Sequence, residues 1–335
     1  MSATSMRIPV ISNIPLLSEK VRAALALLPS STGAVIDVVP VNSAVLSGPG
    51  SIDVATLELL RNAKVILGDP KLVISALPHA PRVEWVQSTF AGVEVILTQP
   101  RRDFTLSRAG GIMGQHMAQY VLGWIISKER MFHLAPVHQA NKEFRSKDMR
   151  YRHFQNVTVG ILGFGDIGTV IATLVSTAGF RVIGLKRSSG TPSGTLTSRI
   201  PTTTDLHEVL SVADYVVNVL PSTEQTRNLL SGNAFQACQT KKPCFINVGR
   251  GDVVDEASLV VALDKSWLSS AVLDVFAVEP LPAESALWVR KDVVITPHVA
   301  ALSMPEDVAG VFARNLSHFQ AGESLEYTFK WSHGY

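Results

Sequence analysis

Residues 157–186 read VTVGILGFGDIGTVIATLVSTAGFRVIGLK, and this stretch decides the fold. The apolar run over 157–162 predicts a buried strand, the residues up to about Ala178 predict a helix, and 180–186 predict a second strand. Between the first strand and the helix, the glycines form the pattern G-x-G-x-x-G. Such a loop is typical of the Rossmann unit, which binds the pyrophosphate of a dinucleotide at a helix N-terminus.

Each glycine of the loop has a separate physical role. The first permits the tight turn, the second lets the backbone approach the pyrophosphate, and the third lets the helix pack closely on the strand. A glycine-rich turn that serves packing alone is the alternative, but the strands on both sides favour nucleotide binding. The residues expected to bind the dinucleotide here are Gly163, Phe164, Gly165, Asp166, Ile167 and Gly168.

The end of the second strand indicates which dinucleotide is bound. An NAD site places an acidic residue there to accept from the ribose 2′-hydroxyl, whereas Arg and Lys attract a 2′-phosphate. This chain has Lys186, Arg187 and Ser188 at that point, and no Asp or Glu over 186–200. We therefore expect NADP(H) as the preferred cofactor, with Arg187 as the main phosphate ligand and NAD(H) still possible. A solvated basic turn is the alternative.

Outward from this unit, short apolar runs alternate with helical patterns along the whole chain. The further strands are expected at 8–14, 36–41, 64–67, 83–87, 214–220, 244–248, 270–275 and 292–296. This alternation predicts an α/β protein with doubly wound parallel sheets. Ser18 is expected to cap one helix, and Asp69-Pro70 to begin another.

Two domains are expected within the 335 residues. The tail over 305–322 has a helical pattern and is expected to return to the N-terminal domain. The first domain therefore comprises 1–106 and 302–335, and the dinucleotide-binding domain 107–301. A long amphipathic helix is expected over 112–130, followed by a polar connecting segment at 138–153.

Composition excludes several classes of protein. Thirty Lys and Arg against 28 Asp and Glu leave a net charge of +2, unlike a protein held to nucleic acid by its overall charge. Two cysteines cannot form a disulfide framework, which favours a reducing compartment. The N-terminus lacks the pattern of a signal peptide, and the longest apolar stretch contains glycines and Asp166. We expect a cytoplasmic protein with no membrane or nucleic-acid partner.

Three later motifs each offer one reactive side chain at the end of a predicted strand. They are FINVGRG at 245–251, LDVFAVEPLP at 273–282 and TPHVA at 296–300. Open α/β sheets bind ligands at this edge. The reactive side chains are Arg250, Glu279 and His298.

Reduction of a keto acid needs these three chemical types. A guanidinium binds the substrate carboxylate, an imidazole donates a proton to the ketone oxygen, and a carboxylate orients the imidazole and favours its protonated form. Alone, His298 could be a histidine bonded to backbone, Arg250 a salt-bridge residue and Glu279 a loop carboxylate. Together, downstream of a nucleotide loop, they favour catalysis.

With these motifs in place, the chain resembles the D-isomer-specific 2-hydroxyacid dehydrogenases over nearly its whole length, most strongly at 157–301. The ending DVFAVEPLPAESALW, followed by VVITPHVAALSMPED and a terminal GY, resembles the glyoxylate/hydroxypyruvate reductase branch. The resemblance implies a Rossmann nucleotide domain, a flavodoxin-like substrate domain and a cleft between them. It also implies that Arg250, Glu279 and His298 are the catalytic set.

The resemblance implies further binding residues. Asp274 would hold the nicotinamide carboxamide, Leu220, Pro221 and Thr226 would lie near the adenosine and phosphates, and Val248 and Gly249 near the nicotinamide ribose. In the turn STFAGVE at 88–94, the N–H groups of Ala91 and Gly92 would bind the substrate carboxylate together with Arg250.

The expected function is therefore NADPH-dependent reduction of a small 2-keto acid, such as glyoxylate or hydroxypyruvate, to the D-2-hydroxy acid. The alternative is a nucleotide-sensing, corepressor-like binding module on the same fold, because fold alone does not fix function. The family also implies a homodimer, with the helix over 112–130 as a contact. No metal is expected, since no carboxylate or cysteine cluster joins His133 and His138.

Overall fold

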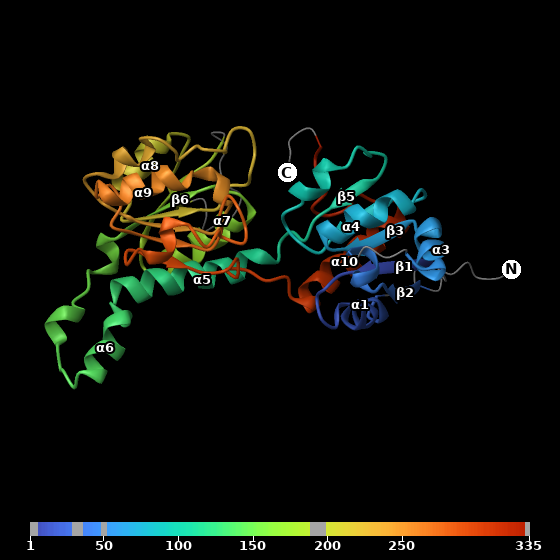
Figure 1. Ribbon diagram of the computed structural model, residues 1–335, viewed down its shortest axis with the longest axis horizontal. Coiled ribbons are helices and arrows are strands. Elements are labelled where there is room, and N and C mark those ends of the chain that lie inside the picture. The colour runs from blue at the N-terminus through green and yellow to red at the C-terminus, as the bar shows by residue number, and fades with distance from the viewer. Residues whose placement is uncertain (1–5, 29–35, 48–51, 188–198, 332–335) are drawn as a thin grey trace. The chain divides into compact units, whose positions relative to one another are not determined.

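The computed structural model describes residues 6–28, 36–47, 52–187 and 199–331 of the chain (Figure 1). It divides into unit 1, Met1–Met113 with Ser303–Tyr335, and unit 2, Gly114–Leu302. The sequence predicts domain boundaries a few residues away, between residues 106 and 107 and between residues 301 and 302. Gly110 and Gly111 belong to unit 1 because the ring of Tyr327 fills the space where their side chains would be.

Unit 1 is built on a five-stranded parallel sheet. Its strands are β1 (Met6–Ile11), β2 (Ile36–Pro40), β3 (Val65–Gly68), β4 (Trp85–Ser88) and β5 (Thr105–Ser107). The order β2-β1-β3-β4-β5 is the flavodoxin-like order. Its helices are α1 (Leu17–Ala26), α2 (Ser43–Ser47), α3 (Val54–Asn62), α4 (Pro70–Ala76) and α10 (Pro305–Ala321).

Two helix starts in unit 1 differ in how they are capped. Helix α1 begins at Leu17 after Leu16 in a left-handed conformation, with φ of 61°, so the expectation that Ser18 caps this helix is wrong. Helix α4 begins at Pro70 after Asp69, as predicted. The carboxylate of Asp69 does not bond to the helix, because it accepts from other segments of the unit.

The C-terminal helix α10 completes unit 1, as expected from the helical pattern of the tail. Its buried face contributes Val308, Phe312 and Leu316 to an apolar core shared with β1, α1 and β4. The rings of Trp85 and Phe312 stack with centroids 5.3 Å apart. A segment that follows the N-terminal part of unit 1 only after the whole of unit 2 is thus part of the core of unit 1.

Unit 2 is built on a seven-stranded parallel sheet. Its strands are β6 (Thr158–Leu162), β7 (Arg181–Leu185), β8 (Thr202–Thr203), β9 (Tyr215–Asn218), β10 (Cys244–Asn247), β11 (Ser270–Leu273) and β12 (Val293–Ile295). The order β8-β7-β6-β9-β10-β11-β12 is that of a Rossmann fold with one added strand. Its strand order reverses between β6 and β9, and ligands bind at such a switch point.

Helices cover both faces of this sheet (Figure 1). They include α5 (Met113–Glu129), which begins at the last residue of unit 1, α7 (Asp166–Thr177), α8 (Leu206–Val212) and α9 (Glu256–Asp264). Two apolar clusters, one on each face, bury strand residues such as Ile161, Val217 and Phe245. The strand predictions in this unit are confirmed to within a few residues, but β8 and, in unit 1, β5 were missed because strands of two or three residues show no alternation.

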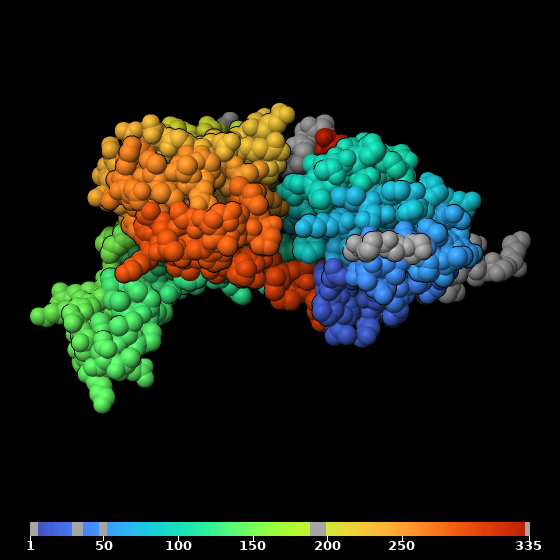
Figure 2. Space-filling model, in the orientation of Figure 1, coloured from blue at the N-terminus to red at the C-terminus, as the bar shows by residue number. Residues whose placement is uncertain are grey.

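The polar segment after α5 lies outside the core of unit 2, as predicted. It forms the short helix α6 (Ala135–Ala140) and single helical turns, and it projects from the rest of the unit (Figures 1 and 2). Phe132, Val137, Phe144 and Tyr151 leave half or more of their surface exposed. Within the described ranges, every helix is too short or too polar to span a bilayer.

Candidate active site

The glycine turn after β6 fits a dinucleotide. Gly163 has φ of 104°, a conformation that a side chain would strain, and a Cβ at Gly168 would lie 1.9 Å from the carbonyl oxygen of Gly163. A Cβ at Gly165, in contrast, would meet nothing within 4 Å. Gly165 also precedes helix α7 with no side-chain cap, so the helix N-terminus remains open to a phosphate.

Phe164 in this turn has a packing role. The ring lies against β7, where it occupies the space that a Cβ at Gly184 would fill. The Phe164 N–H donates to the carbonyl of Leu185 at 2.9 Å. Phe164 therefore fixes the turn to the neighbouring strand.

Basic residues follow β7, the strand next to β6. Lys186 is half-buried and its N–H donates to the carbonyl of Thr203, while Arg187 is exposed. Both lie at the carboxyl edge of the sheet, as the predicted 2′-phosphate site requires. Ser188 lies outside the described residues.

The loops after β9 and β10 are joined by two buried amides. Asn218 Nδ2 donates to Asn247 Oδ1 at 2.8 Å, and both side chains are buried. A Cβ at Gly249 would lie 2.8 Å from the Leu220 carbonyl oxygen, so only glycine allows these loops to lie so close. Neither asparagine was predicted as a site residue from the sequence, although an amide inside an apolar strand is a recognisable signal.

Five expected cofactor residues, Gly249 among them, lie in these two loops. Leu220 and Pro221 directly follow β9, at the switch point. The hydroxyl of Thr226 donates to the Pro221 carbonyl at 2.5 Å and so shapes the loop, while Val248 is 1% exposed. Their contacts with a cofactor stay predictions.

His298 and Glu279 form a direct pair. His298 Nδ1 lies 2.8 Å from Glu279 Oε2, while Glu279 Oε1 accepts from the Phe276 N–H at 3.0 Å. Since an ionised carboxylate only accepts, the shared proton sits on Nδ1. The other ring nitrogen, Nε2, has no hydrogen-bond partner among the described residues.

The backbone of His298 is strained and firmly held. Its φ is +54°, which is unusual for a residue with a side chain. The His298 N–H donates to the Asp274 carbonyl at 2.9 Å, and the N–H groups of Val299 and Ala300 donate to the Asp274 carboxylate at 2.9 Å. Asp274 therefore positions the loop that carries the imidazole.

This role bears on the predicted function of Asp274. Its side chain is 1% exposed, and besides the two N–H groups it accepts from the Thr296 hydroxyl at 2.5 Å. Three hydrogen bonds from one loop account for most of its accepting capacity. Contact with a nicotinamide carboxamide stays a prediction for this residue.

Tyr120 of α5 extends this network. Its hydroxyl lies 2.6 Å from Thr296 Oγ1. Because Thr296 gives its only hydroxyl proton to Asp274, the Tyr120 hydroxyl is the donor in this contact. Burial raises the pKa of Tyr120, which keeps the phenol protonated. Sequence reasoning missed both Tyr120 and Thr296, because 176 residues separate them.

Arg250 follows β10, the strand next to β11. Its Nη1 donates to the Gly249 carbonyl at 2.8 Å, and Asn247 Nδ2 donates to the Arg250 carbonyl at 3.2 Å. The adjacent Gly251 packs so closely on the backbone of Phe276 that a Cβ would lie 1.9 Å away. Because Phe276 leads into Glu279, the segments that carry Arg250 and Glu279 are in direct contact.

In unit 1, the turn after β4 contains Ala91 and Gly92, both half-buried. Asp69 organises the start of this turn by accepting from the hydroxyls of Thr89 at 2.5 Å and Ser12 at 2.6 Å. Asp69 was predicted only as a helix cap. Substrate binding by the N–H groups of Ala91 and Gly92 stays a prediction.

A Rossmann sheet with an open glycine turn at its switch point and a His–Glu pair at the same edge places the chain among the dinucleotide-dependent oxidoreductases. The family profile of the D-isomer specific 2-hydroxyacid dehydrogenase, NAD binding domain, matches residues 122–300. The chain therefore belongs to the D-isomer specific 2-hydroxyacid dehydrogenase family, as its motifs suggested. It is an NAD(P)-dependent oxidoreductase.

Similar proteins agree with this assignment. The glyoxylate/hydroxypyruvate reductase A of Serratia proteamaculans is 30% identical over 257 residues, covering 74% of this chain and 80% of that protein. A D-isomer specific 2-hydroxyacid dehydrogenase family protein of Aeromonas salmonicida superimposes with a TM-score of 0.83 at 32% identity, covering 98% and 99% of the two chains. An NADPH-dependent glyoxylate/hydroxypyruvate reductase of Sinorhizobium meliloti, solved with NADP and sulfate, superimposes with a TM-score of 0.79 at 28% identity. The match covers 99% of this chain and 100% of that protein.

Proposed function

We propose that this protein reduces a small 2-keto acid, such as glyoxylate or hydroxypyruvate, to the D-2-hydroxy acid with NADPH. The observation that carries the proposal is the 2.8 Å contact between His298 Nδ1 and Glu279 Oε2 at the edge of the sheet that also bears the glycine turn. A binding module needs the turn but has no use for an oriented proton donor. This pair therefore favours an enzyme over the corepressor-like alternative.

The side chains have distinct roles in this proposal. Nε2 of His298 donates a proton to the ketone oxygen, while Glu279 holds Nδ1 and stabilises the positive charge of the ring. The Arg250 guanidinium binds the substrate carboxylate and polarises the carbonyl. A bound nicotinamide supplies the hydride that reduces the keto carbon.

NADPH is proposed over NADH because of Lys186 and Arg187. Both follow β7 next to the glycine turn, where an NAD site has an acidic residue. Relatives solved with NADP or NADPH, from Sinorhizobium meliloti and Xanthobacter autotrophicus, support this preference.

We also propose a homodimer, formed through the helix over 112–130, as the resemblance implies, and through the segment that follows it. Phe132, Val137 and Phe144 expose apolar surface on this segment, and Phe144 has no burial at all. Exposed apolar surface gathered on one segment marks a site of protein association.

The test is a substrate panel run with both cofactors. NADPH absorbance is followed with glyoxylate, hydroxypyruvate and phenylpyruvate, and the series is repeated with NADH. The proposal expects turnover with at least one small 2-keto acid and a lower KM for NADPH than for NADH. Tight NADPH binding with no turnover of any 2-keto acid would contradict the proposed reaction.

A further inference from the structure

A second polar pocket lies in unit 2, at the end of the sheet opposite the glycine turn. Its volume is about 410 Å³, and it is lined where strands β9, β10 and β11 begin. The pocket lies at the amino ends of these strands, whereas the proposed catalytic residues follow carboxyl ends of strands of the same sheet. A strand of four residues, such as β10, spans roughly 13 Å between the two edges of the sheet. The charged residues that line this pocket are Lys128, Arg152, Asp214, Lys241 and Lys242.

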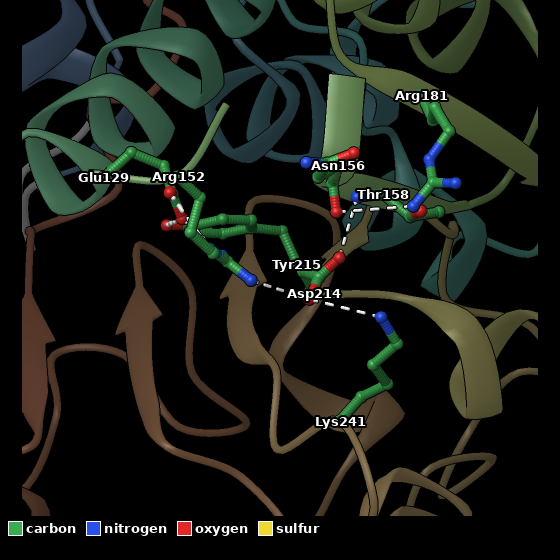
Figure 3. Close-up of polar contacts among 8 residues, drawn as sticks. All are labelled: Glu129, Arg152, Asn156, Thr158, Arg181, Asp214, Tyr215 and Lys241. Atoms are coloured by element: carbon green, nitrogen blue, oxygen red, sulfur yellow. Dashed lines mark hydrogen bonds and ion pairs between the residues drawn. The ribbon is translucent and has the colours of Figure 1, made fainter. Parts of the chain in front are cut away.

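In this pocket the Arg152 guanidinium forms ion pairs with two buried carboxylates (Figure 3). Its Nη1 donates to Asp214 Oδ1 at 2.8 Å and its Nη2 donates to Glu129 Oε1. The side chains of Asp214 and Glu129 are only 6% and 5% exposed. Burial of an unpaired carboxylate is costly, so the Arg152 guanidinium is required to pair with these two carboxylates. It is therefore not available to bind a ligand.

The same carboxylates are saturated by other donors. Asp214 Oδ2 accepts from the Thr158 N–H at 2.8 Å, and Glu129 Oε1 accepts from the Tyr215 hydroxyl at 2.7 Å (Figure 3). Burial and the adjacent Glu129 both raise the pKa of Tyr215, so the phenol adds no negative charge. The carboxylates therefore have little capacity left to neutralise the lysines.

The three lysines are less well compensated. Lys241 Nζ lies 3.5 Å from Asp214 Oδ1, an oxygen that Arg152 already occupies (Figure 3). Lys128 Nζ donates to the hydroxyl of Ser270 at 3.1 Å, which carries no charge. The Lys242 ammonium group has no hydrogen-bonding or ionic partner among the residues that the structure describes.

The position of Lys242 is nevertheless fixed by its backbone. It has φ of 49°, and its N–H donates to the Cys238 carbonyl at 2.7 Å. With four cations from Lys128, Arg152, Lys241 and Lys242 against two carboxylates from Glu129 and Asp214, the pocket has an excess of two positive charges. A site of this kind attracts a small anion.

We propose that this pocket binds a phosphate group, either as inorganic phosphate or as the monoester of a small molecule. The Arg152 guanidinium is occupied, and the other cations that line the pocket are ammonium groups, which bind phosphate as point charges. A phosphate monoester carries a charge close to −2 at neutral pH, which matches the excess. The hydroxyl of Ser269 also lines the pocket. This site does not depend on the proposed reaction.

Binding should stabilise unit 2, because the ligand would join the end of α5 to the turns before β10 and β11. The experiment is isothermal titration of the full chain with inorganic phosphate and with glycerol phosphate, alongside thermal unfolding in the two anions. Potassium chloride at matched ionic strength is the reference, and saturating NADPH is added in a parallel series to block the nucleotide site.

Two lysines are replaced singly to test the pocket, with two matched controls. Lys128→Ala and Lys242→Ala should each weaken phosphate binding about tenfold or more, since hydrogen bonds to charged groups have this effect. Lys291→Ala removes an exposed lysine of unit 2 that does not line the pocket and should leave binding unchanged. Arg187→Ala should also leave it unchanged, because that residue belongs to the proposed nucleotide site.

Three results would overturn the proposal. The first is equal stabilisation by chloride, which would show charge screening alone. The second is phosphate binding that Arg187→Ala or NADPH abolishes and Lys242→Ala does not. The third is a change of oligomeric mass in Lys242→Ala with no phosphate binding to the original chain, which would assign the pocket to an interface between copies.

Discussion

His298 and Glu279 are 19 residues apart in sequence, and their side chains meet at 2.8 Å between Nδ1 and Oε2. Each residue follows a different strand, β12 for His298 and β11 for Glu279, and these strands are parallel neighbours. Their carboxyl ends therefore lie at one edge of the sheet, and the two loops converge there. The position of the pair follows from topology as well as from residue type.

The first prediction concerns His298. Replacement by Gln should lower kcat for reduction by about 100- to 10,000-fold, the usual contribution of a positioned proton donor. The Kd for NADPH, measured by fluorescence titration, should stay within a factor of about two of the value for the original chain. Such a difference is well below the tenfold change in Kd that corresponds to about 1.4 kcal/mol. His207→Gln, at an exposed position on α8, is the control and should retain full activity. Equal activity of both variants would remove His298 from the mechanism.

The second prediction concerns the charge of Glu279. Glu279→Gln keeps the shape of the side chain but removes the negative charge beside the imidazole. The value of kcat for reduction should then fall, because the ring has lost the charge that orients it and stabilises its positive form during proton transfer. The measurement is kcat and KM for both proteins under the same conditions. An unchanged kcat would contradict the role assigned to this carboxylate.

The third prediction concerns positioning by Tyr120 and Thr296. Thr296→Val removes the hydroxyl that links Tyr120 to Asp274, and should cost about 1–3 kcal/mol of stability, as expected for a buried partner left unpaired. Tyr120→Phe should have a smaller effect in the same direction. In both variants kcat should fall while KM for NADPH changes little, because the displaced loop carries His298. The control is Tyr151→Phe, at a half-exposed position in the projecting segment, which should leave kcat unchanged. An unchanged kcat in Thr296→Val would contradict the positioning role.

The fourth prediction concerns cofactor preference. Arg187→Ala should raise KM for NADPH about 10- to 100-fold, as expected for the loss of charged hydrogen bonds, and should barely change KM for NADH. Arg181→Ala, at the opposite end of the same strand, is the control. If Arg187→Ala impairs both cofactors equally, the 2′-phosphate is bound elsewhere or not at all.

The fifth prediction concerns the two cysteines. Both are buried and unpaired, and burial raises the pKa of Cys238 to about 12 and also raises that of Cys244. A raised pKa leaves less thiolate, the reactive form, so both thiols should react slowly in the folded chain. Iodoacetamide at pH 8 should therefore modify neither thiol in the folded chain. In guanidinium chloride it should modify both. The number of modified thiols is measured by mass spectrometry. Rapid labelling of the folded protein would contradict this.

The sequence by itself determined the two doubly wound sheets, the glycine turn and the three proposed catalytic residues. These features depend on local patterns, since hydrophobic periodicity marks each strand and the spacing of Gly163, Gly165 and Gly168 follows from the geometry of one turn. The helical pattern of the tail was also visible in the sequence, but its place in the core of unit 1 comes from the structure. Short strands such as β8 escaped detection because they are too short to show a pattern.

Only the tertiary structure decided which polar groups support those residues. Asn218 and Asn247 are 29 positions apart, and Tyr120 and Thr296 are 176 apart, so no local pattern predicts either contact. Ser18 failed as a helix cap, and the carboxylate of Asp69 turned from its own helix to hydroxyls of two other segments, because packing overrode local preference. Strand order brings distant loops together, and hydrogen bonds act over about 3 Å in space, whatever the separation along the chain.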